Sequence, residues 1–202
     1  MKRIALSLCV LTLVLAPLAE ARGSKAVTEP GKYTGWSDAD IDEIEIVKTF
    51  SSADYDTIVV VPFDSEIKPE GDKAVIIQGA LDGYTAVFVE GLRDDLKSEA
   101  KVEIANDEPK TTKKTLVIRG SVEELNPGSR AKRYVAGFGA GAARNKVSVE
   151  IVDAATGETL VRFTQAHRSA GTFKFAGGSD AQVLRDGTRA MGEDTAAILN
   201  EF

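Results

Sequence analysis

The chain has 202 residues, among them 25 Lys and Arg, 31 Asp and Glu, one His and one Cys, and its formal net charge is −6. An acidic balance disfavours a nucleic-acid partner, because binding to phosphates needs a basic surface. A single Cys and a single His exclude a Cys/His zinc site and a disulfide framework. The length and a hydrophobic content of 43% suit one soluble domain with its own core.

The first 21 residues have the pattern of a signal peptide. Lys2 and Arg3 precede an apolar run over residues 4–16, and small residues stand at Ala19 and Ala21. The run is too short for a bilayer, which needs ~20 apolar residues. We expect cleavage after Ala21 and export to the periplasm, with no transmembrane span in the mature chain.

The single cysteine does not predict a lipid anchor. Cys9 lies inside the apolar run and follows Leu8, where lipid attachment requires a small residue. We therefore expect a protein that is not a lipoprotein. Because Cys9 leaves with the signal peptide, the mature chain has no thiol, and its stability must come from a packed core.

Residues 22–40 contain scattered Gly, Pro and charges with little periodicity, so we expect an extended or mobile N-terminal arm. Trp36 is the one large aromatic residue there, and it either pins the arm to the domain or contacts a partner. Residues 41–202 are expected to form a single domain.

The first half of this domain shows three elements. Residues 43–50 alternate, with Ile44 and Ile46 on one face, which is typical of a half-exposed strand. Residues 57–63 are a β-branched run that suits a strand buried on both faces. Apolar residues at helical spacing then predict one helix over residues 73–99. Its glycines at positions 79, 83 and 91 are interpreted as points of close approach to the sheet, and the alternative is a break of the helix near Gly79.

The second half predicts four strands and a final helix. Strands are expected at residues 101–105, 115–125, 147–151 and 159–167, and the last two are joined by a hairpin turn at 153–157. Ser179 or Asp180 can cap a C-terminal helix with an apolar inner stripe. The fold class is therefore two-layer α/β, with one mixed sheet packed against helices.

The sequence offers little catalytic chemistry. His167 is expected to be an exposed residue at the end of a strand and no G-x-S-x-G motif exists, so a Ser-His-Asp triad is disfavoured. The glycines over residues 137–142 match a dinucleotide-binding pattern in letters, but a strand follows where that motif needs a helix. We predict no catalytic residue, no metal site and no cofactor, and hence a protein that is not an enzyme.

One segment departs from the acidic average. Residues 126–146 carry five cations and no acid, around a stretch of small and apolar residues. The segment is either a packed turn whose cations reach the acidic body, or a docking surface for an acidic surface or an envelope protein. The candidate contact residues are Arg130, Lys132, Arg133, Tyr134, Phe138 and Arg144.

Several motifs together resemble the bacterial family called domain of unknown function 4410. They are the run at residues 116–130, Arg133-Tyr134 with the glycines of 137–141, the turn at 153–157 and the strand at 59–63. The resemblance implies a bacterial envelope protein, often a lipoprotein, without an established activity. The order of elements is also similar to the α/β domains of periplasmic peptidoglycan-synthase activators and of curli secretion proteins.

We therefore expect a non-catalytic binding module of the bacterial cell envelope. The alternative is a carboxylate-dependent hydrolase acting on an envelope polymer. That alternative needs a cleft with two facing Asp or Glu residues, at least one with a raised pKa.

Overall fold

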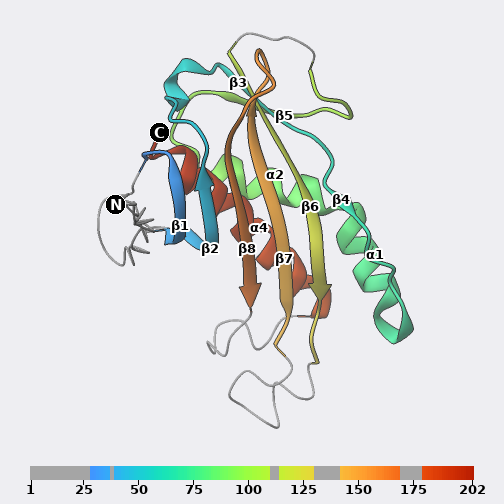
Figure 1. Ribbon diagram of the computed structural model, residues 1–202. Helices are drawn as coiled ribbons and strands as arrows, with labels where there is room; N and C mark the ends of the chain where they lie inside the picture. Colours follow the sequence, from blue (N-terminus) through green and yellow to red (C-terminus); the bar gives the residue numbers. More distant parts are fainter. Residues whose placement is uncertain (1–27, 37–38, 110–113, 130–141, 169–178) are drawn as a thin grey trace, which may run out of the picture.

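The computed structural model describes residues 28–36, 39–109, 114–129, 142–168 and 179–202. They form one mixed eight-stranded sheet with helices packed on one side, as Figure 1 shows. This confirms the predicted two-layer α/β fold. The strands run in the order β1-β2-β8-β7-β6-β3-β5, and the short β4 pairs with β6.

The strands fall into an antiparallel and a parallel part. Antiparallel pairs join β1 (Gly31–Trp36), β2 (Ala39–Ile46), β8 (Thr159–Arg168), β7 (Arg144–Asp153) and β6 (Thr115–Asn126). Parallel pairs join β6 to β3 (Thr57–Val60) and to β4 (Asp64–Ser65), and β3 to β5 (Lys101–Ile104). The antiparallel part has one face without helices, as such sheets commonly do.

Three helices are described, and they share one side of the sheet (Figure 1). They are α1 (Ala74–Asp82), α2 (Tyr84–Asp95) and α4 (Asp180–Leu199). The first two follow a 3-10 turn at Gly71–Lys73, and another such turn lies at Ser52–Asp54. Within the described residues no single helix could span a membrane; by length and composition alone, the bent pair over residues 71–95 could.

The core lies between the sheet and the pair α2 and α4. Buried side chains at alternate strand positions, such as Ile118, Val149 and Ile151, meet Phe88 and Leu92 from α2. Burial of each such side chain stabilises the fold by about 1.5–3 kcal/mol. The sheet positions between them point to the other side, and the candidate site is built from those positions.

The predicted helix over residues 73–99 is interrupted. It bends by 52° at Gly83 and ends at Asp95, so α2 is buried in the core, whereas α1 packs against the core with no fully buried residue. The interpretation of the glycines was also wrong. A Cβ on Gly91 would lie 2.0 Å from the Arg189 carbonyl oxygen of α4, whereas Gly79 has nothing within 4 Å. The close approach is therefore between two helices.

The residues assigned to the arm include a strand. Gly31–Trp36 form β1 at one edge of the sheet, so the folded part begins before residue 41. Trp36 is 9% exposed, and its ring stacks on Phe202 with centroids 6.4 Å apart. Phe202 stacks in turn on Phe50 at 4.5 Å. Trp36 thus pins the strand to the C-terminal end of the chain.

The predicted hairpin turn and the helix cap are confirmed. Gly157 has a left-handed φ of 72°, and the Asp153 side chain accepts the N–H groups of Ala155 and Thr156 at 2.7 and 3.0 Å. Although burial raises the pKa of Asp153, hydrogen bonds from Tyr55 and Thr156 lower it below its usual value. Ser179 accepts the N–H of Gln182 at 3.2 Å, as expected for an N-cap.

Candidate functional site

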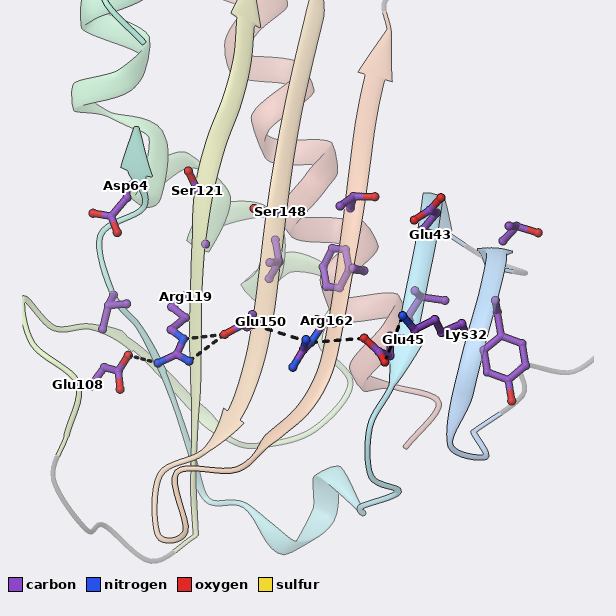
Figure 2. A pocket seen from close by; sticks show the side chains of 18 of the residues that line it. Lys32, Glu43, Glu45, Asp64, Glu108, Arg119, Ser121, Ser148, Glu150 and Arg162 are labelled. Atoms are coloured by element: carbon purple, nitrogen blue, oxygen red, sulfur yellow. Dashed lines mark hydrogen bonds and ion pairs between the residues drawn. The ribbon is translucent and has the colours of Figure 1, made fainter. Parts of the chain in front are cut away.

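The helix-free side of the sheet, hereafter the open face, carries the larger of the two described hollows. Its volume is about 660 Å³, and its floor spans β1, β2, β8, β7 and β6. Val61 and Pro62, between β3 and β4, form one wall together with Glu108. Figure 2 shows the side chains that line it.

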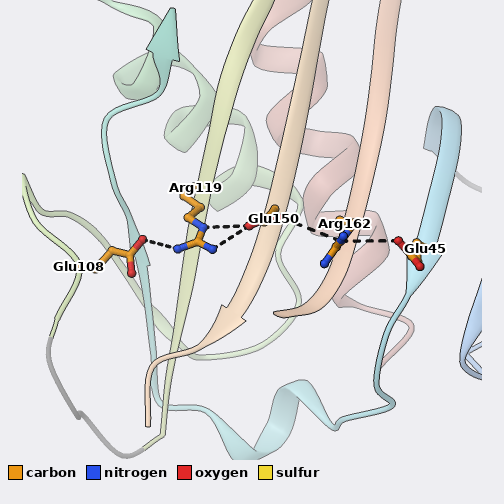
Figure 3. A network of polar contacts seen from close by, with 5 residues as sticks. All are labelled: Glu45, Glu108, Arg119, Glu150 and Arg162. Carbon is orange, nitrogen blue, oxygen red and sulfur yellow. Dashed lines mark hydrogen bonds and ion pairs between the residues drawn. The ribbon is translucent and has the colours of Figure 1, made fainter. Parts of the chain in front are cut away.

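Charged residues cross this floor in a single line, the ion row. Pairing between neighbouring strands places Lys32 beside Glu45, Glu45 beside Arg162, Arg162 beside Glu150, and Glu150 beside Arg119. Glu108 completes the line next to Arg119 (Figure 3). Signs alternate along the whole row, which therefore contains three cations and three anions and has no net charge.

The contacts along the ion row differ in strength. Arg119 donates to Glu150 at 2.8 and 3.0 Å and to Glu108 at 2.7 Å. These hydrogen bonds outweigh burial and raise the pKa of Arg119 above its usual value. Arg162 is held more loosely, because its Nε lies 3.6 Å from Glu45 and 3.9 Å from Glu150. Its guanidinium makes no hydrogen bond to another described residue, so its donors are available to a ligand.

A second line of polar side chains runs beside the ion row, two residues away from it on each strand. Strand pairing aligns Thr34 with Glu43, Glu43 with Thr164, Thr164 with Ser148, Ser148 with Ser121, and Ser121 with Asp64. We call Ser121, Ser148 and Thr164 the hydroxyl row. None of the three hydroxyl groups hydrogen-bonds to another residue in the described part of the chain, so each can bind a ligand.

The two rows follow from the alternation of each strand. Val147, Val149 and Ile151 turn toward the helices and are buried, which leaves Ser148 and Glu150 on the open face. In β2, Ile44 and Ile46 likewise leave Glu43 and Glu45 on it. Neighbouring strands lie about 4.8 Å apart, so each row presents a polar group at roughly that interval.

Of the sequence-predicted contact residues, the structure describes only Arg144. Arg130, Lys132, Arg133, Tyr134 and Phe138 fall outside the described residues. Arg144 begins β7, with its side chain 55% exposed and 3.9 Å from Glu124 of β6. Lys146 lies 2.6 Å from Glu123. The two described cations of the basic segment thus reach acids of the same domain.

His167 is also placed by the structure. We expected an exposed histidine at the end of a strand. His167 does lie near the end of β8, but it is partly buried against α4, where a Cβ on Gly187 would lie 3.2 Å from its ring. It does not line the open-face hollow. Among the described residues, no group of three His, Cys, Asp or Glu side chains is arranged to hold a metal ion.

One carboxylate on the helix side has a raised pKa. Burial raises the pKa of Asp194, although hydrogen bonds from the Asp40 N–H and from Gln165 lower it. Gln165 is fully buried on β8, and Asp194 lies on α4. This pair is therefore separated from the open-face hollow by the sheet itself.

Comparison with known proteins supports the predicted resemblance. The model of the family domain of unknown function 4410 matches residues 81–172. These residues run from the end of α1 to just beyond β8, and they include three of the strands that form the floor of the hollow. No curated protein sequence matches the chain.

Solved structures match this chain only at low sequence identity and with TM-scores below 0.5. PelC from Paraburkholderia phytofirmans, a dodecamer, is 15% identical with a TM-score of 0.47, over 75% of this chain and 94% of that chain. A protein of the domain of unknown function 330 family from Xanthomonas campestris is 13% identical with a TM-score of 0.43, over 73% and 85%.

Proposed function

We propose that the protein is a non-catalytic binding module of the bacterial cell envelope, and that its open face binds a neutral, hydroxyl-rich polymer such as a glycan. The observation that carries the proposal is the hydroxyl row, whose groups lack partners in the described chain, beside a charge-balanced ion row in a hollow of about 660 Å³.

A hydroxyl-rich ligand matches both rows. Ser and Thr hydroxyls donate and accept, and so do the hydroxyls of a sugar, so each contact can form in either direction. Arg162 adds donors, and Glu43 and Asp64 add acceptors beside the hydroxyl row. The lining includes three cations and five carboxylates, so a polyanion would be repelled.

The charge arrangement also supports binding over hydrolysis. A pair of catalytic carboxylates needs one group that holds its proton near neutral pH. Glu45, Glu108 and Glu150 each face a guanidinium on the floor. Asp194, whose pKa is raised, lies on the other side of the sheet. These placements favour the non-catalytic proposal over the carboxylate hydrolase.

Placement in the envelope rests on the signal pattern of residues 1–21 and on the resemblance to envelope proteins. The proposal is a periplasmic protein whose mature chain starts at Arg22, without a lipid anchor. Fractionation of the expressing bacterium, followed by N-terminal sequencing of the purified protein, tests both statements. A lipid-modified or membrane-retained product would contradict them.

Binding can be tested by filling the hollow. Ser148→Tyr places a large ring in the middle of the hydroxyl row, while Glu103→Tyr places the same ring on β5, outside the hollow. We expect binding to a neutral glycan to fall in the first variant only. Equal binding by both variants, with unchanged circular dichroism, would contradict the proposal.

The basic segment remains a second proposed contact, for an acidic surface or an envelope protein. Replacing Arg130, Arg133 and Arg144 by Glu should reduce co-purification of envelope components after crosslinking in cells, since cations at the segment's ends would meet acids of a partner. Unchanged co-purification would make the segment a structural connection only. The Ser148→Tyr variant separates this contact from the open face.

A further inference from the structure

A second hollow lies between α1 and the end of β6, and we call it the α1 groove. Its volume is about 430 Å³. Ile67, Ile77 and Leu125 provide apolar surface, and Glu70, Asp72 and Glu124 stand among the polar lining residues. None of these residues lines the open-face hollow, so the two sites are separate.

Helix α1 is unusually apolar for its exposure. Its sequence AVIIQGALD contains six apolar residues, yet no residue of this fully described helix is buried. Val75 is 85% exposed, and Ile77 is only partly covered by the core. Apolar surface left uncovered at a groove is typical of a contact site.

The single cation in the lining is already engaged. Lys73 donates to Asp180 at 2.8 Å and also to the Gly128 carbonyl oxygen, so it fastens the start of α4 to the end of β6. The lining also includes four carboxylates, those of Glu70, Asp72, Glu123 and Glu124.

The groove acids already bind cations from a neighbouring strand. Lys146 reaches Glu123 at 2.6 Å, and Arg144 lies 3.9 Å from Glu124. Glu70 and Asp72, on the α1 side, have no ion pair with any residue in the described ranges. The charge of the groove therefore complements a cation supplied from outside, next to an apolar floor.

We propose that the α1 groove binds a peptide segment of a partner protein in which apolar side chains are flanked by Lys or Arg. The apolar side chains occupy the floor at Ile67 and Ile77, which are only partly buried, and the flanking cations meet Glu70 and Asp72 at the rim. Apolar contact with α1 gives most of the affinity, while the rim charges set orientation and association rate.

The interaction should depend on salt in a characteristic way. Attraction between exposed charges is screened within about 8 Å at physiological ionic strength, so the contribution of the rim falls as salt is added. The contribution of the floor is insensitive to salt, because burial of apolar surface is not electrostatic. Binding should weaken with salt and then level off above zero.

Three synthetic peptides, KKLLKK, KKSSKK and EELLEE, serve as probes in fluorescence anisotropy with the full mature chain. KKLLKK should bind, while KKSSKK and EELLEE should each bind at least about tenfold more weakly, a difference of about 1.4 kcal/mol. Equal binding of KKLLKK and KKSSKK would overturn the apolar part of the proposal.

Charge-reversed variants locate the site. Glu70→Lys with Asp72→Lys should weaken KKLLKK binding about tenfold and remove its salt dependence. The control variant, Glu99→Lys with Asp107→Lys, replaces two exposed acids outside the groove and has the same net charge as the groove variant. It should bind KKLLKK as the wild-type chain does. Equal weakening by both pairs would overturn the assignment to the groove.

Ultracentrifugation of the same variants separates a foreign partner from a second copy. If the wild-type chain self-associates and the Glu70→Lys, Asp72→Lys variant does not, a second copy occupies the groove and the proposed partner is overturned. A monomeric wild-type chain that binds KKLLKK supports the proposal.

Discussion

Replacing Gly192 with alanine should destabilise the fold, because α2 and α4 cross with their backbones in contact at this residue. A Cβ on Gly192 would lie 2.0 Å from the Phe88 carbonyl oxygen and 2.7 Å from the Leu92 nitrogen. Both atoms belong to the backbone of α2, so no side chain can rotate away. The helices would have to separate by about 1 Å or more to reach van der Waals contact.

The size of the effect follows from two opposing terms. Overpacking of a core costs about 1–3 kcal/mol or more, and the separation of the helices also loosens Phe88 and Leu92. Alanine is a better helix former than glycine by about 1 kcal/mol, which offsets part of this cost. We expect a net loss of about 2 kcal/mol, and so a fall in Tm of about 4–8 °C for a domain of this size.

A matched control removes the propensity term from the comparison. Gly79 lies on the exposed side of α1 with nothing within 4 Å of a Cβ, so Gly79→Ala should raise stability by up to about 1 kcal/mol. Differential scanning calorimetry and urea unfolding would measure both variants. If Gly192→Ala matched or exceeded the wild-type Tm, the backbone contact between α2 and α4 would be refuted.

Three further predictions concern the buried and capping groups. Burial raises the folded pKa of Asp194, so the folded state binds this proton more tightly than the unfolded state and stability is lost as pH rises through the folded pKa. Asp194→Asn should therefore have the higher Tm at pH 7, and the difference should close toward about pH 4; a constant difference would contradict this reasoning. Asp153→Ala removes the acceptor for Tyr55, Ala155 and Thr156 and should cost about 1–2 kcal/mol in urea unfolding, whereas Asp153→Asn, which keeps one acceptor oxygen, should cost less. Phe202→Ala removes the ring stacked between Trp36 and Phe50 and should lower unfolding free energy by about 2–3 kcal/mol, with a change in Trp fluorescence; an unchanged spectrum would argue against the stack.

The sequence predicted those elements whose causes are local. The turn at residues 153–157 needs an Asp acceptor and a left-handed glycine, and both can be identified from the sequence of these five residues. The C-terminal helix was equally readable, since its inner stripe of Val183, Leu184 and Met191 is buried as expected. A break of the preceding helix was open only as an alternative near Gly79, and its position at Gly83 was missed because the apolar spacing continues across it.

The position of Trp36 could not be predicted either, because it depends on a contact with a residue distant in the sequence. The sequence left two interpretations of this residue, and the pinning contact depends on Phe202, which is far away in the chain. Residues 31–36 also lack clear alternation, so β1 was assigned to an arm. An edge strand pairs with only one neighbour, and β1 is held by its pairing with β2, which its own sequence does not predict.

The sequence predicted that the open face is polar, but it did not predict how the charged side chains on it are arranged. The alternation of Val147, Val149 and Ile151 already assigned Ser148 and Glu150 to a polar face, and Glu43 and Glu45 were assigned similarly. Which charge meets which is decided by the strand order β1-β2-β8-β7-β6, and that order joins strands more than 100 residues apart. A shift of one residue in any pairing would move its side chains to the other face of the sheet. The alternating signs of the ion row are therefore a consequence of the strand register. The ion row in turn stabilises that register. A two-residue slip of β8 would set Thr164 opposite Glu150 and leave Arg162 without its carboxylates.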